Sequence, residues 1–168
     1  MIVLGVPVLA GAMLLVVAGL EHIRDPRSLS RAANTGMAMA RVIAVVELLI
    51  GVPSVVAVLM GTTQLRWALA AQTLIYLAFA AHLWWRKRRG DTSDCGCNRM
   101  GTQVGPGSIA RAGLIAVTTV AATLVYPAAT LPGGAGAVLL VVAAVVLAVL
   151  LYTLPAAVDG RAMPGSTS

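Results

Sequence analysis

Five long apolar stretches, separated by short polar segments, constrain this chain more than any other feature. Each has about the 20 mostly apolar residues that a helix needs to cross the hydrocarbon core of a bilayer. The composition agrees, because 59% of the 168 residues are hydrophobic and 11% are charged, whereas a water-soluble domain carries about a quarter charged residues. We therefore expect an all-α protein, a polytopic transmembrane helical bundle with five spanning helices. The stretches are residues 2–20, 37–60, 65–85, 109–131 and 135–154.

The same composition limits the classes of protein to which this chain can belong. So much apolar surface cannot be hidden in a water-soluble core of this size, and two cysteines are too few for a secreted disulfide scaffold. The formal net charge is +6, but no aromatic-lined basic face accompanies it, so we expect no nucleic-acid partner. We expect residues 1–154 to form one bundle in the lipid bilayer and residues 155–168 to form a short polar tail.

The basic residues predict which segments face the cytoplasm, because cytoplasmic loops of membrane proteins carry an excess of Lys and Arg. Three arginines lie between residues 21 and 36, six of the 12 basic residues lie between residues 86 and 111, and the segments of the opposite side hold only Arg66. We therefore expect the N-terminus outside, with the first and third connections and the tail in the cytoplasm. The membrane would be a cytoplasmic (inner) membrane of the bacterial type. The first stretch lacks a basic region and a cleavage site, so we expect it to remain in the mature protein.

The connection from residue 86 to residue 108 is long, polar and rich in glycine, and it contains both cysteines, Cys95 and Cys97. The glycine between the two thiols permits the turn that a disulfide would require. A ring this small is strained, and strain favours exchange over a structural role. We therefore interpret the two cysteines as a redox-active pair. The alternative is two incidental free cysteines.

Metal binding is a second interpretation of the same two cysteines. Two thiolates are too few for a closed zinc site, which takes four ligands. The predicted topology adds His22, at the end of the first helix, and His82, near the end of the third, to the same membrane face. Cys95, Cys97, His22 and His82 could then converge in a metal-binding or metal-transport protein.

Two groups of polar side chains lie within the predicted helices. Glu47 is the one acid deep in a spanning stretch, where an ionisable group is a candidate functional residue unless an interhelical hydrogen bond accounts for it. Gln72, Tyr76 and Phe79 recur at helical spacing in the third stretch and form one face. That face could contact a quinone ring, with Glu47, Gln72 and Tyr76 as its polar contacts. The alternative is ordinary interhelical packing with polar side chains between the helices.

Three segments in this order resemble the MauE/DoxX-like family of redox-associated integral membrane proteins. They are Gly19–Pro26 (Gly-Leu-Glu-His-Ile-Arg-Asp-Pro), Glu47–Gly51 (Glu-Leu-Leu-Ile-Gly) and Cys95-Gly96-Cys97. The resemblance covers roughly the first hundred residues. It implies a four-helix core similar to the DoxX and vitamin K epoxide reductase type, and an association with thiol, sulfur and quinone redox beside a thioredoxin-like partner.

The resemblance also implies roles for particular residues. Cys95 and Cys97 match the Cys-x-Cys of the family, Glu47 matches its acid in the second helix, and Arg24-Asp25-Pro26 matches its charged turn. His22 departs from the pattern, since many relatives have Lys there, and Asn98-Arg99-Met100-Gly101 replaces the usual Phe-Gly. The sequence thus predicts a membrane thiol-disulfide redox protein that exchanges with a thioredoxin-like protein, with a possible quinone acceptor.

One conflict within these expectations concerns the side of the membrane. Disulfide formation on exported proteins requires the thiols outside, whereas the count of basic residues puts this connection inside. A cytoplasmic connection points instead to sulfur handling or thiol homeostasis.

Overall fold

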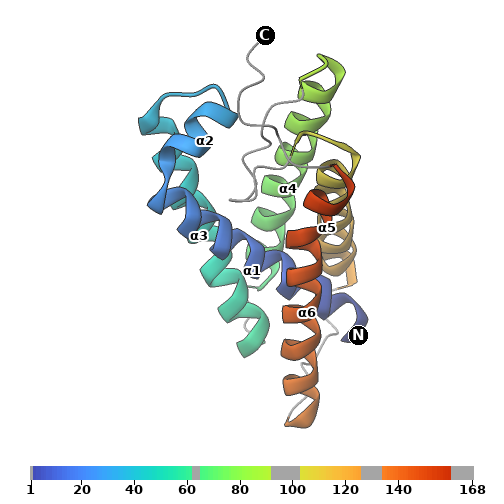
Figure 1. Ribbon diagram of the computed structural model, residues 1–168. Coiled ribbons are helices and arrows are strands. Elements are labelled where there is room, and N and C mark those ends of the chain that lie inside the picture. The colour runs from blue at the N-terminus through green and yellow to red at the C-terminus, as the bar shows by residue number, and fades with distance from the viewer. Residues whose placement is uncertain (1, 62–64, 92–102, 126–133, 160–168) are drawn as a thin grey trace.

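The computed structural model describes residues 2–61, 65–91, 103–125 and 134–159. Within these ranges the chain forms six helices: α1 (Ile2–Arg24), α2 (Pro26–Ala32), α3 (Met37–Met60), α4 (Leu65–Arg88), α5 (Pro106–Val125) and α6 (Ala135–Val158). All of them except α2 are long and apolar enough to cross a membrane. The predicted polytopic helical bundle is therefore confirmed (Figure 1).

The helix ends extend beyond the apolar residues from which they were predicted. α1 continues to Arg24 and α4 to Arg88, so both helices include charged residues in their last turn, and α6 continues to Val158, into the residues expected to form the tail. α5 begins at Pro106 rather than at residue 109, because proline suits the first turn of a helix, where its missing N–H costs nothing. The connection predicted for residues 86–108 is correspondingly shorter, and residues 126–131 of the fourth predicted helix lie outside the described residues.

The short helix α2 was not predicted from the sequence. It starts with Pro26 at its first position after Asp25, and its Leu29 and Ala32 are buried against the bundle. A helix of 7 residues is too short to be recognised from stretches of about 20 apolar residues, the length that spans a membrane. α2 fills the connection between the first two spanning helices.

α1 is the central helix, and it packs against α3, α4, α5 and α6. Small residues make this close packing possible, as is usual in membrane bundles. A Cβ on Gly11 would lie 2.6 Å from both the Gln72 amide and Ile115, and one on Gly51 would lie 2.9 Å from Val16. Figure 1 shows α1 crossing the bundle obliquely between α3 and α6.

The bundle has two ends of different character. α1, α4 and α6 finish toward one end of the bundle, where α3 and α5 begin (top of Figure 1). We name this end the polar end. The opposite end, where α3 finishes and α4 and α6 begin, contains a purely hydrophobic cluster around Leu9 and Leu69, and we name it the apolar end.

Candidate functional site

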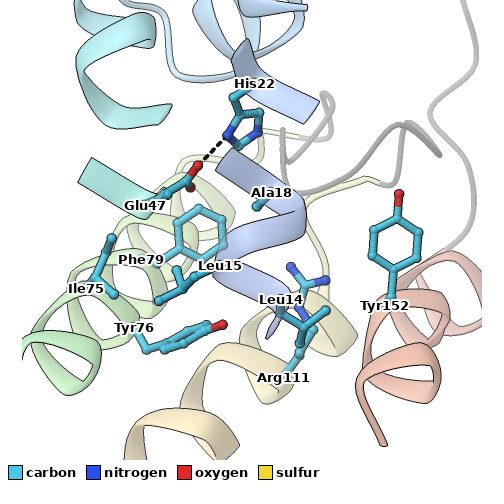
Figure 2. A pocket seen from close by; sticks show the side chains of 10 residues that line it. All are labelled: Leu14, Leu15, Ala18, His22, Glu47, Ile75, Tyr76, Phe79, Arg111 and Tyr152. Atoms are coloured by element: carbon cyan, nitrogen blue, oxygen red, sulfur yellow. Dashed lines mark hydrogen bonds and ion pairs between the residues drawn. The ribbon is translucent and has the colours of Figure 1, made fainter. Parts of the chain in front are cut away.

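A cavity of about 50 Å³ lies within the bundle, toward the polar end. Its lining comes from all five long helices and is mostly apolar, with a few polar groups that converge on it (Figure 2). The lining residues are Leu14, Leu15, Ala18 and His22 of α1, Glu47 of α3, Ile75, Tyr76 and Phe79 of α4, Arg111 of α5 and Tyr152 of α6.

The centre of this site is a buried pair formed by His22 and Glu47. Nδ1 of His22 and Oε2 of Glu47 are 2.7 Å apart, and the two residues are only 4% and 7% exposed. The contact joins the last turns of α1 to the interior of α3 (Figure 2). An ionisable side chain at such a position is costly unless it has a partner, so the pair explains how Glu47 is accommodated. Sequence reasoning singled out Glu47 but did not find this partner.

Arg111 brings a buried positive charge to the same cavity. It is 7% exposed, and its guanidinium points from α5 toward Leu14 and Ala18 of α1 (Figure 2). Nη1 of Arg111 donates a long hydrogen bond of 3.5 Å to the carbonyl of Leu151. Pro155, four residues later in α6, has no N–H to donate to that carbonyl. Arg111 therefore binds a carbonyl that the proline leaves without its helical partner.

Tyr152 links α6 to the end of α1. Its hydroxyl donates to Oε1 of Glu21 at 2.8 Å, while Oε2 of Glu21 is buried and has no hydrogen-bond partner within the described part of the chain. Glu21 does not line the cavity itself, but it contacts Tyr152, which does. The roles of Glu21, Arg111 and Tyr152 were not predicted from the sequence. For Glu21 and Arg111, the available signal was a charged residue near the end of a predicted helix. For Tyr152 there was none.

The sequence model of the family described as methylamine utilisation protein MauE matches residues 1–125. This chain belongs to the MauE family. No curated protein and no solved structure matches it. The matched residues contain α1–α5 and therefore most of the cavity, whereas α6 lies beyond them.

In this member of the MauE family, α6 nevertheless contributes to the site. It supplies Tyr152 and the Leu151 carbonyl. Asp159 follows the end of α6, and its carboxylate accepts hydrogen bonds from the backbone N–H groups of Gly107 and Ser108 at 2.7 and 2.8 Å. The Ser108 hydroxyl donates to the same carboxylate at 2.8 Å. Asp159 thus satisfies the free N–H groups at the start of α5, as a capping residue does.

The predicted polar face of α4 is divided between two roles. Gln72 donates to the carbonyl of Val8 at 3.0 Å and Tyr76 donates to the carbonyl of Gly11 at 2.8 Å, so both act as polar contacts between α4 and α1. Tyr76 and Phe79 also line the cavity, but Gln72 does not. Of the residues predicted for a quinone, Glu47 and Tyr76 therefore share one space and Gln72 lies outside it.

Cys95 and Cys97 lie outside the described residues, but both flanks of their segment are described. Before it, Nε of Arg86 is 2.7 Å from Oδ2 of Asp91. After it, the hydrogen bonds of Asp159 hold the start of α5. The described residues on both sides of this segment therefore lie at the polar end.

The predicted metal ligands are only partly described. His22 is bound to Glu47, and His82 is partly buried in the last third of α4. Among the described residues, no group of three or more His, Cys, Asp and Glu side chains is arranged to hold a metal ion. The predicted set with Cys95 and Cys97 extends beyond those residues and stays a prediction.

Proposed function

We propose that this protein is a membrane thiol-disulfide redox protein in which Cys95 and Cys97 alternate between a dithiol and a disulfide, exchanging with a thioredoxin-like partner. Membership of the MauE family and the Cys-Gly-Cys sequence support this proposal. The observation that carries it is the position of the two flanks of the thiol segment. Both are fixed at the polar end, the end toward which the buried His22–Glu47 pair and Arg111 gather.

The exchange has two steps, and in each step one sulfur–sulfur bond breaks while another forms. The thiolate of one cysteine attacks a disulfide sulfur of the partner, forming a mixed disulfide and releasing one partner thiolate. The second cysteine then attacks the first, which closes the Cys95–Cys97 disulfide and releases the other partner thiolate. Two electrons pass to the partner, and the two protons lost by the pair are taken up by the partner thiolates. The reverse direction uses the same steps.

Quinone is a further part of this proposal. A quinone would accept two electrons and two protons from the reduced pair, with Glu47, Tyr76 and Gln72 as candidate contacts. Glu47 and Tyr76 face a common cavity, which supports the idea. Small-molecule sites usually have volumes of about 300–1,000 Å³, whereas this cavity of about 50 Å³ has room for a few water molecules, each of which needs about 10–15 Å³. Binding of a quinone ring therefore requires side chains such as Phe79 to move.

Replacement of each cysteine tests the thiol chemistry. The full-length reduced protein in lipid nanodiscs would be incubated with a thioredoxin whose resolving cysteine has been replaced and whose remaining cysteine is joined by a disulfide to 5-thio-2-nitrobenzoate. Attack by a thiolate of this protein releases the nitrothiobenzoate and forms the mixed disulfide, which would be measured on non-reducing gels. We expect wild type to form and resolve it, and one of the variants Cys95→Ser and Cys97→Ser to accumulate it. Unchanged behaviour of both variants contradicts the proposal. Thr153→Ala, which leaves both thiols in place and changes an exposed side chain that bonds only within α6, is the control.

The side of the membrane can be measured with the same cysteines. An impermeant thiol reagent would be applied to sealed vesicles from each side, with and without prior reduction. We propose that the thiol segment faces the cytoplasm, so we expect labelling from that side alone. Labelling from the outside would instead support oxidation of exported proteins.

Metal binding is the second candidate function, and one observation favours it. A metal-binding imidazole typically donates its other ring nitrogen to a carboxylate, which fixes its orientation, and His22 and Glu47 are 2.7 Å apart. Elemental analysis of the purified protein would show stoichiometric metal, lost in Cys95→Ser and in His22→Gln. Metal that is absent, or retained in both variants, rejects this function.

A further inference from the structure

A hollow at the polar end lies between α2 and the start of α3, apart from the cavity described above. It has a volume of about 450 Å³ and is lined by Arg27, Ser30, Arg31 and Met37. This volume falls within the range of about 300–1,000 Å³ that is typical of small-molecule sites. The lining combines two cations, a hydroxyl and one apolar side chain.

The two arginines come together because α2 is amphipathic. Leu29 and Ala32 are buried against the bundle, which leaves Arg27 and Arg31, one turn apart, on the outer face. Nε of Arg31 donates to the carbonyl of Arg27 at 3.4 Å. The Ser30 hydroxyl donates to the carbonyl of Thr35 at 2.5 Å, which ties α2 to the turn before α3. The hollow is therefore built by local hydrogen bonds.

Within the part of the chain that the structure describes, no carboxylate forms an ion pair with these arginines. The ion pairs found within the described ranges are His22–Glu47 and Arg86–Asp91, and neither involves Arg27 or Arg31. Both guanidinium groups can therefore bind an external anion. Guanidinium groups match the oxygens of a phosphate group with two parallel hydrogen bonds, which makes arginine well suited to phosphate recognition.

The place of α2 identifies the source of that phosphate. α1 and α3 are both long enough to span the membrane, and the short helix α2 lies between them in the chain, ending five residues before α3 begins. A helix in that position is expected at the level of lipid headgroups, and Met37, the first residue of the spanning helix α3, contributes the apolar part of the lining. Anionic lipids attract basic segments next to membrane spans.

We propose that the hollow formed by Arg27, Ser30, Arg31 and Met37 binds the headgroup of an anionic phospholipid. The phosphate accepts hydrogen bonds from Arg27 and Arg31, and the apolar side of the lipid contacts Met37. This site is independent of the thiol chemistry, since its residues neither line the cavity nor flank the thiol segment.

Lipid retention tests the proposal directly. The full-length protein in detergent would be stripped of lipid, mixed with equal amounts of phosphatidylglycerol and phosphatidylcholine, and examined by native mass spectrometry. We expect one preferentially retained phosphatidylglycerol. In Arg27→Gln/Arg31→Gln we expect that preference to fall about thirtyfold, as for two lost cations at a membrane surface. Both arginines are exposed, so circular dichroism should show unchanged helix content.

Two controls separate this site from a general effect of charge or of phosphate. Arg66→Gln/Lys87→Gln removes the same charge away from the hollow and should retain the wild-type preference. Arg27→Lys/Arg31→Lys keeps the charge but loses the paired hydrogen bonds, and should retain an intermediate preference. An equal loss in the Arg66→Gln/Lys87→Gln variant, no preference in wild type, or displacement of the lipid by millimolar inorganic phosphate would each overturn the proposal.

Discussion

The two ends of the bundle are stabilised by different interactions. At the apolar end, Leu9 and Leu69 are almost fully buried among other aliphatic side chains. Toward the polar end, ionisable groups converge from different helices, and two of the carboxylates described there, Glu47 and Glu21, are paired with His22 and Tyr152. Apolar packing therefore stabilises the apolar end. At the polar end, hydrogen bonds between ionisable side chains contribute to stability, and the same side chains are able to take part in chemistry.

The largest difference between the ends should appear when the buried pair is broken. In His22→Leu the Glu47 carboxylate loses its partner inside the membrane, and we expect the free energy of unfolding to fall by about 3–5 kcal/mol. Unfolding in mixed micelles, followed by loss of helix content, measures this change.

The double variant provides the control for that prediction. His22→Leu/Glu47→Leu replaces both members of the pair with apolar side chains, which in buried pairs is often neutral or stabilising. We expect its stability to be close to that of wild type. A single variant as stable as wild type would show that the pair does not stabilise the polar end.

At the apolar end, Leu9→Ala should act through packing alone. Lipid tails are as apolar as leucine, so the change removes contacts between helices but little hydrophobic driving force. We expect a loss of about 2 kcal/mol, the lower limit for a buried Leu→Ala change, and unchanged mixed-disulfide formation. Leu139→Ala, at a position 67% exposed on α6, should change stability by less than about 0.5 kcal/mol. Loss of thiol exchange in Leu9→Ala would show that the two ends are coupled.

These differences also explain how much could be predicted from the sequence. The five spanning helices follow from the length of the apolar stretches, and this part of the fold was predicted correctly. The site was predicted only in part, because its contacts join residues far apart in the chain: His22 and Glu47 are 25 residues apart, and Tyr152 and Glu21 are 131 apart. The positions and angles at which the helices cross determine such contacts, and the hydrophobic pattern of the sequence does not specify those positions and angles.

The structural use of Gln72 and Tyr76 illustrates the same limit. Their spacing indicates one helical face, but it does not distinguish a ligand contact from a hydrogen bond to a neighbouring helix. The structure supplies the acceptors, the Val8 and Gly11 carbonyls of α1. Arg111 lies within the fourth predicted stretch but was counted with the basic residues of the connection before it, because the sequence does not show that its side chain is buried in the bundle.

A smaller effect is expected where α6 holds the start of α5. Asp159→Ala removes the acceptor for the Gly107 and Ser108 amides, and we expect a loss of about 1 kcal/mol, as for other capping residues. Hydrogen exchange of these two amides should accelerate, and the rate at which Cys95 and Cys97 react with a thiol reagent should change. Asp25→Ala is the matched control, because Asp25 precedes α2 without a side-chain capping bond. Equal exchange rates in both variants would contradict a capping role for Asp159.

The smallest effects separate two kinds of tyrosine hydrogen bond. Tyr152→Phe removes the donor to a partly buried carboxylate whose second oxygen has no partner in the described residues, and we expect a loss of about 1 kcal/mol. Tyr76→Phe removes a donor to the Gly11 carbonyl, which also accepts a bond within its own helix, so its loss should be nearer to about 0.5 kcal/mol. Unfolding measured for both variants under the same conditions gives the difference directly. A Tyr76→Phe loss equal to or larger than that of Tyr152→Phe would mean that hydrogen bonds to carboxylates are not what distinguishes the polar end.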